Sequence, residues 1–231
     1  MKISSFVLPL LTLAFTAQPK AAMAACTPSS PSDFKIPDFG LILPLPPDKN
    51  IQILLTLLES VIPPIQTYET PMAIRFTNLF DTMSWNCVAT YHASYKSALP
   101  QNNDNQDKYK LIRSQDATTY TTDARQLCGV YAFAAALPGF FDEDVSATET
   151  FLSGFPAQGL GLTESNIGIP SDLLDSCPDP MVKQCLEEYA TCHGFTPPTM
   201  GAIVAYQALA YSRTDGWNSE GTLAKAGRSC K

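Results

Sequence analysis

The chain has 231 residues and a formal charge of −7, with 15 Lys and Arg against 22 Asp and Glu. Such an acidic balance argues against nucleic acid as a partner, because phosphate backbones attract basic faces. It argues equally against binding to anionic membrane surfaces. The length fits a processing signal followed by a single domain.

Residues 1–24 have the pattern of a secretory signal peptide. Lys2 precedes an apolar run over residues 6–17, and residues 22–24 (Ala-Met-Ala) suit a cleavage site. The run is too short to span a bilayer, and no other stretch is apolar enough, so we expect no membrane span. The sequence predicts a mature chain from about residue 25, with a formal charge of about −9, that is secreted or luminal. A buried helix of the mature domain, and a lipoprotein lipidated at Cys26, are the alternatives.

All seven cysteines follow the predicted signal, and in a secreted protein they are expected to form disulfides. An odd number leaves at least one thiol without an intrachain partner. Cys185 and Cys192 are seven residues apart on a predicted helix, which places them about 10 Å apart along its axis and beyond disulfide reach. Each should therefore pair elsewhere, for example with Cys177 or Cys230. The disulfide candidates are Cys26, Cys87, Cys128, Cys177, Cys185, Cys192 and Cys230.

Residues 25–69 are predicted to form an N-terminal arm. Residues 27–48 are rich in proline, which fixes φ and removes a hydrogen-bond donor, so we expect an extended segment. Residues 50–62 suggest a short apolar helix that ends at Pro63 and packs on the main body. A helix that contacts a partner or lipid is the alternative.

Residues 70–231 are predicted to form a single all-α domain, a bundle of about five helices. The first helix covers residues 71–99, where Thr70 can cap it and Pro71 suits its first turn. Apolar residues recur along it at helical spacing and predict a buried stripe. The stripe consists of Ile74, Leu79, Met83, Val88, Tyr91 and Tyr95.

Four more helices are expected, and no segment alternates with period two for long enough to suggest a strand. The second helix should stop at Pro138, and the fourth at Gly194. Residues 154–175 form a predicted loop with room for a helical turn. The helices are predicted at residues 123–137, 142–153, 179–192 and 197–213. Their alanine content favours close helix packing in a bundle.

The last predicted helix carries a narrow face of small residues. Gly201, Ala205 and Ala208 lie at i, i+4 and i+7, so they share one side of the helix. Such a face allows a neighbouring backbone to approach closely.

Three short patterns occur in a recognisable order. Residues 75–91 (RFTNLFDTMSWNCVATY) place an acid, a Trp, an Ala and a Tyr at set positions; the small-residue helix follows, and then Asp-Gly-Trp-Asn. In this respect the chain resembles the vanadium-dependent haloperoxidase-like proteins, relatives of the type 2 phosphatidic acid phosphatases. The matching positions are Asp81, Trp85, Ala89, Tyr91, Gly201, Asp215, Gly216 and Asn218.

The resemblance implies a helical scaffold without its chemistry. The family holds vanadate or phosphate with a lysine, two arginines, a Ser-Gly-His run and a second histidine; cations balance the anion, and imidazole acts as nucleophile or ligand. Here the two histidines, His92 and His193, lie in other contexts, and only eight residues follow Leu223. We therefore expect no catalytic, cofactor-binding or metal residue in this chain, and vanadate only if a missing C-terminal half, from a completing chain or domain, supplies the site.

The matching residues also have simpler structural interpretations. Asp81 can be satisfied by a neighbouring segment, with a substrate or metal role as the alternative. Gly216 can end a helix, while Asp215 and Asn218 can bond within a turn or contribute to the rim of a site. Cys177, Cys185, Cys192 and His193 can be imagined as zinc ligands, although they lack the close Cys-x-x-Cys pairs typical of structural zinc.

Three functions remain open from the sequence. The first is a secreted, non-catalytic scaffold of haloperoxidase type, either a shortened relative or part of a longer product. The second is a disulfide-stabilised extracellular binding or structural domain. The third is an enzyme whose site follows no familiar motif, since neither a nucleophile elbow, a phosphate loop nor a zinc-protease motif occurs.

Overall fold

The computed structural model describes residues 70–99, 109–113, 121–141, 145–154 and 159–214. The predicted signal, the arm, the helix at residues 50–62, Cys26, Cys230 and the Asp215–Asn218 turn lie outside these ranges. The described part contains six helices and no strand, which confirms the all-α prediction. The helices are α3 (Thr70–Thr90), α4 (Thr122–Phe141), α5 (Val145–Ser153), α7 (Ser171–Ser176), α8 (Lys183–His193) and α9 (Pro197–Ser212).

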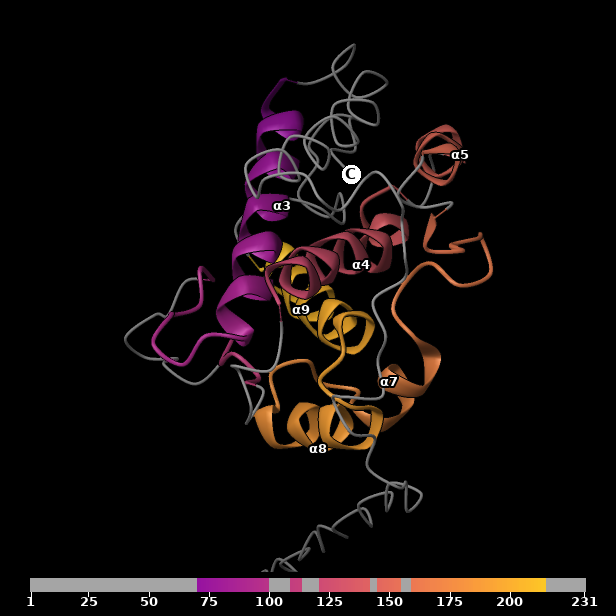
Figure 1. The fold of residues 1–231 in the computed structure, drawn as a ribbon. Helices are drawn as coiled ribbons and strands as arrows, with labels where there is room; N and C mark the ends of the chain where they lie inside the picture. The colour runs from indigo at the N-terminus through magenta and orange to yellow at the C-terminus, as the bar shows by residue number, and fades with distance from the viewer. Residues whose placement is uncertain (1–69, 100–108, 114–120, 142–144, 155–158, 215–231) are drawn as a thin grey trace, which may run out of the picture.

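Helices α4 and α9 lie at the centre, α3 packs against both, and α7 and α8 cover one end (Figure 1). Among the described helices, α5 packs mainly against α4. Aromatic rings fill the space between α3, α4 and α5. Phe80 meets Phe133, and Phe133 meets Phe151, both edge to face with centroids 5.4 and 5.2 Å apart. The result is one continuous core around α4.

Helix α9 begins where the sequence predicts, because Thr196 has extended backbone angles and Pro197 and Pro198 fill its first turn. Gly201 explains how closely it approaches α4. A Cβ at this position would lie 2.7 Å from Tyr131 Cβ and 2.8 Å from both Ala132 N and Cys128 O. Ala205 and Ala208 are also buried. The predicted small-residue face therefore forms the α4–α9 contact.

Helix α3 ends at Thr90 rather than at Leu99 as predicted. The chain turns back after Thr90, and Arg113 donates to the carbonyl oxygens of Ala89, His92 and Tyr95. The predicted stripe is buried at Leu79, Met83 and Tyr91, whereas Ile74 is 57% exposed and Tyr95 is 37% exposed. Periodicity alone missed the end because the residue that stabilises the turn comes from a distant segment.

Helix α4 continues past Pro138 to Phe141, so its predicted end at Pro138 was wrong. Proline has no N–H for the carbonyl four residues earlier, which here belongs to Ala134. Gly168 donates its backbone N–H to this oxygen at 3.2 Å and so replaces the lost helical partner. Gly168 has φ +99, a conformation that favours glycine.

Helix α8 starts at Lys183, four residues later than predicted, and ends at His193 before Gly194. Asp179 accounts for the late start, because its carboxylate accepts the backbone N–H of Met181 at 2.9 Å and its carbonyl accepts that of Val182 at 3.2 Å. These bonds form a turn in place of the first helical residues. Gly194 follows the helix with φ +78, a backbone conformation that favours glycine.

Candidate functional site

A group of exposed rings lies where α3 ends. Trp85 and Tyr95 stack with centroids 5.2 Å apart and an interplanar angle of 11°. His92 stacks on the same tyrosine, with centroids 3.8 Å apart and an angle of 15°. Trp85 is 45% exposed although it lies on a helix that is otherwise largely packed. We refer to Trp85, His92 and Tyr95 as the aromatic patch.

Side chain–backbone hydrogen bonds hold the aromatic patch in place. The indole Nε1 of Trp85 donates to the carbonyl of Lys96 at 2.8 Å. The buried Asn86 accepts the backbone N–H of Ala98 at 2.8 Å. Together with Arg113, these bonds anchor the loop that carries His92 and Tyr95 to the end of α3. The rings are therefore ordered by the fold and still face solvent.

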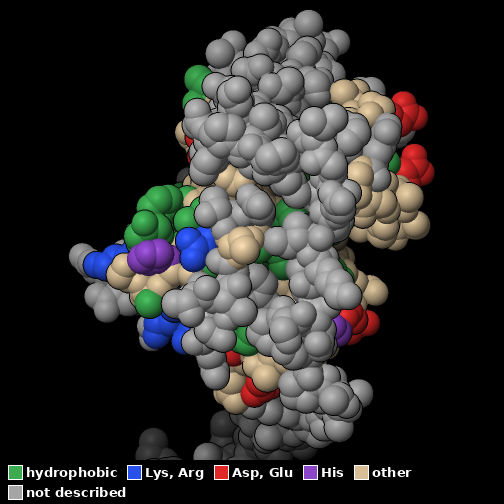
Figure 2. Space-filling view, in the orientation of Figure 1, with side chains coloured by type: hydrophobic (Ala, Val, Ile, Leu, Met, Phe, Trp, Pro, Cys, Tyr) green, Lys and Arg blue, Asp and Glu red, His purple; other side chains and the backbone are tan. Residues whose placement is uncertain are grey.

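The space-filling view shows hydrophobic, Lys or Arg, and His side chains gathered together on one side of the molecule (Figure 2). Three cationic residues lie in the described segments after α3, Lys96, Lys110 and Arg113, and one acid, the exposed Asp81, lies one helical turn before Trp85 on α3. Cations therefore outnumber acids around the patch, although the chain as a whole has a formal charge of −7.

The other histidine belongs to a second cluster, between α7 and α8. Asp172 Oδ2 accepts a hydrogen bond from the Tyr189 hydroxyl at 3.3 Å and lies 3.5 Å from His193 Nε2. The rings of Tyr189 and His193 stack 4.2 Å apart. Burial, and then the negative charge and hydrogen bond of Asp172, raise the pKa of the Tyr189 phenol. The hydroxyl therefore stays protonated as a donor, and the cluster ties α7 to α8.

Two disulfides join described residues. Cys87 in α3 pairs with Cys128 in α4, and both are fully buried. Cys177 pairs with Cys185, one of the pairings expected from the sequence. Because Cys185 is bonded to Cys177, it does not bridge Cys192, as expected. Cys192 is disulfide-bonded as well.

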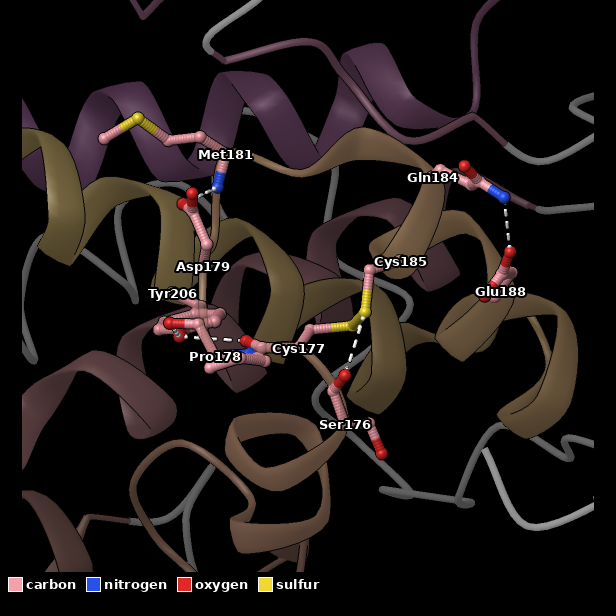
Figure 3. Close-up of a disulfide and its surroundings, with 9 residues drawn as sticks. All are labelled: Ser176, Cys177, Pro178, Asp179, Met181, Gln184, Cys185, Glu188 and Tyr206. Carbon is pink, nitrogen blue, oxygen red and sulfur yellow. Dashed lines mark hydrogen bonds between the residues drawn. A yellow bond between two sulfur atoms is a disulfide. The ribbon is translucent and has the colours of Figure 1, made fainter. Parts of the chain in front are cut away.

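The Cys177–Cys185 disulfide lies beside α9 (Figure 3). The hydroxyl of Tyr206 on α9 is 3.0 Å from the carbonyl oxygen of Cys177 and 2.9 Å from that of Pro178. The disulfide thus fixes α8 to a segment that α9 already holds. It also removes Cys177 and Cys185 as zinc ligands. Among the described residues, no group of three or more His, Cys, Asp or Glu is arranged to hold a metal ion.

The structure places the first group of haloperoxidase-like positions in different environments. Asp81 is exposed, and partial burial raises the pKa of its carboxyl. Trp85 belongs to the aromatic patch. Ala89 is fully buried. Tyr91 is buried and donates its hydroxyl hydrogen to the carbonyl of Phe195 at 2.8 Å, which ties α3 to the segment before α9. Asp81 and Trp85, four residues apart, are thus both exposed near one face of α3, whereas Ala89 is in the core.

Sequence reasoning did not find either histidine cluster. Tyr189 and His193 are four residues apart on α8, a spacing at which side chains meet. Their contact could therefore have been predicted from the sequence. Asp172 comes from another helix. The patch depends on the turn after Thr90, which the predicted longer helix concealed.

Comparisons with known proteins add no relative: no family model, no curated protein and no solved structure matches the chain. Within the described ranges, no helix has both the length and the apolar character that crossing a membrane requires. Function is therefore inferred from the residues and their contacts.

Proposed function

We propose that the chain is a secreted, disulfide-stabilised helical domain that acts by binding an extracellular ligand, and that the aromatic patch is its contact surface. The observation that carries the proposal is the stack of Trp85, His92 and Tyr95, in which Trp85 and Tyr95 are exposed and His92 is half-buried. Exposed groups of large apolar side chains commonly mark interaction sites, and Trp and Tyr contribute disproportionately to binding energy.

The contacts around the patch support this function. Binding is favoured when side chains are already held in place, because less conformational entropy is lost on association. Arg113, Asn86 and the Trp85 indole provide that order without burying the rings. Secretion is supported by the signal-like residues 1–24 and by the Cys87–Cys128 and Cys177–Cys185 disulfides, which are characteristic of oxidising compartments.

The proposal is tested by presenting the secreted chain to immobilised extracellular polymers, both polysaccharides and proteins. We expect at least one surface to retain the wild-type chain and to retain Trp85→Ala markedly less. Ile74→Ala is the matched control, since Ile74 is also a large, exposed apolar residue of α3. Equal retention of wild type and Trp85→Ala, or no retention of the wild type by any surface, would contradict the proposal.

A scaffold related to the vanadium-dependent haloperoxidases is the second candidate. It rests on the resembling sequence pattern, which includes the helix that begins at Pro197 and its small residues. In this case the anion-binding residues must come from another segment or chain. We expect the chain alone neither to bind vanadate nor to oxidise halide. Peroxide- and vanadate-dependent bromination of a phenolic dye above a no-protein control would contradict that expectation.

A further inference from the structure

The Trp85 ring offers partly exposed apolar surface to a ligand. One face lies on Tyr95, with the rings nearly parallel, and its Nε1–H is already used by the Lys96 carbonyl. The residue is 45% exposed. Its exposed part is therefore aromatic and has no free donor.

A sugar ring complements such a surface. The faces of an aromatic ring carry negative charge density, and the C–H groups on one side of a pyranose ring are weakly positive and apolar. A peptide is the other ligand that aromatic surfaces bind, and the polyglutamate arm of the test below separates an acidic peptide from a carbohydrate.

The charges beside the patch select the kind of carbohydrate. Lys96 is exposed and next in sequence to Tyr95, and its own carbonyl receives the Trp85 indole hydrogen. Its backbone therefore lies beside the rings, and among the described residues its ammonium has no carboxylate partner. Arg113, although bonded to backbone oxygens, adds positive charge to the same region. An anionic group on the sugar would be attracted here.

We propose that the aromatic patch binds an anionic polysaccharide. One sugar ring stacks on the exposed part of Trp85, and its carboxylate or sulfate group lies near Lys96. This inference rests on the proposed binding function and specifies its ligand. Carboxylate and sulfate share the same charge chemistry, so the two sources are separated by experiment.

The test measures binding of the secreted chain to four soluble polymers: a polyuronate, a sulfated polysaccharide, a neutral polysaccharide and polyglutamate. We expect one or both anionic polysaccharides to bind, with affinity falling as salt rises. Trp85→Ala should weaken binding by about tenfold or more. Lys96→Gln should weaken it by roughly two- to fivefold and reduce its salt dependence. Ile74→Ala and Lys183→Gln, an exposed apolar residue and a partly exposed lysine elsewhere, should change it less than about twofold.

A second measurement does not depend on how well Trp85→Ala folds. The chain has two tryptophans, so Trp217→Phe leaves Trp85 as the only indole fluorophore. Stacking of a sugar on its exposed part should change the emission on addition of anionic polysaccharide and leave it unchanged with the neutral polymer.

The possible failures are distinct. Binding to the neutral polymer alone, or to polyglutamate as tightly as to the anionic polysaccharides, would overturn the ligand assignment and leave the binding function standing. Binding to an anionic polysaccharide that Trp85→Ala does not weaken, with no change in Trp85 emission, would overturn the assignment of the patch. Binding to none of the polymers would overturn the assignment, and retention on no extracellular surface would overturn the proposed function as well.

Discussion

The α4–α9 contact and the aromatic patch differ in the size and burial of their side chains. At the contact, Gly201 lets two helices approach until an added methyl group would meet backbone atoms less than 3 Å away. At the patch, large rings lie at the surface and are held by hydrogen bonds to backbone oxygens. The α4–α9 contact is stabilised because Gly201 has no side chain, whereas the aromatic patch consists of large side chains outside the core.

This difference separates the residues that maintain the fold from those available for binding. Substitutions in the α3–α4–α9 core should lower stability and change ligand affinity only through unfolding. Substitutions in the patch should lower affinity and hardly change stability. The four variants below are ordered from the largest expected effect on stability to the smallest, and each would sharpen or break this separation.

The largest effect is expected on removing the Cys87–Cys128 disulfide. It joins α3 to α4 beside the close contact, since Cys128 O is one of the atoms nearest to Gly201. The double variant Cys87→Ala, Cys128→Ala should lose about 2–5 kcal/mol of unfolding free energy, as measured by urea unfolding. A loss no larger than that of an exposed substitution such as Ser94→Ala would show that this disulfide does not support the core.

Ala205→Leu should cost about 1–3 kcal/mol, because the added carbons have no space on a fully buried position of α9. Thermal melts compare it with Thr191→Leu, an exposed position of α8, where the change should be within about 0.5 kcal/mol. Equal melting temperatures for wild type and Ala205→Leu would mean that the α4–α9 contact is looser than described.

Tyr189 should make stability sensitive to alkaline pH. Burial and Asp172 raise the pKa of its phenol above the ordinary value of 10.0, so the folded state disfavours the phenolate. The stabilisation is complete below about pH 10, where the unfolded phenol is protonated, and is lost as pH rises toward the folded pKa. As the pH rises from about 10 to about 11, the unfolding free energy of the wild type should fall by about 1 kcal/mol more than that of Tyr189→Phe.

Urea unfolding at several alkaline pH values checks the Tyr189 prediction, and Tyr95→Phe, at an exposed position, is the control. Parallel pH profiles for wild type and Tyr189→Phe would contradict the buried, hydrogen-bonded phenol. The test also probes a third region, because the α7–α8 cluster includes none of the residues of the aromatic patch and not Gly201.

The smallest effect on stability is expected for Trp85→Ala. The ring is half exposed, and its loss removes one stacking contact and one hydrogen bond at the surface. We expect a loss of less than about 1 kcal/mol in thermal melts, together with the loss of ligand binding proposed above. A loss as large as that of Ala205→Leu would show that the patch is part of the core and would break the comparison.

The sequence predicted a helix end well where the interactions that define it are local in sequence, and poorly where they come from a distant segment. Helix α9 was predicted almost to the residue, since its proline start, small face and apolar content are all local. The ends of α3 and α4 were wrong because Arg113 and Gly168 complete backbone hydrogen bonds from distant segments. The aromatic patch depends on the first of these turns, so it was unpredictable for the same reason. Trp85 was singled out, but for a family pattern rather than for its exposure.

The burial of α9 also determines when the protein can fold. Most residues of this helix are buried, against α3 and α4, which precede it in the chain. During synthesis, α3 and α4 therefore emerge with their apolar faces uncovered and must wait until residue 212 has been made. Cys87 and Cys128 both precede α9 in the chain, so the disulfide that joins α3 to α4 requires no residue of α9. Non-local closure of this kind slows folding and prolongs the exposure of apolar surface.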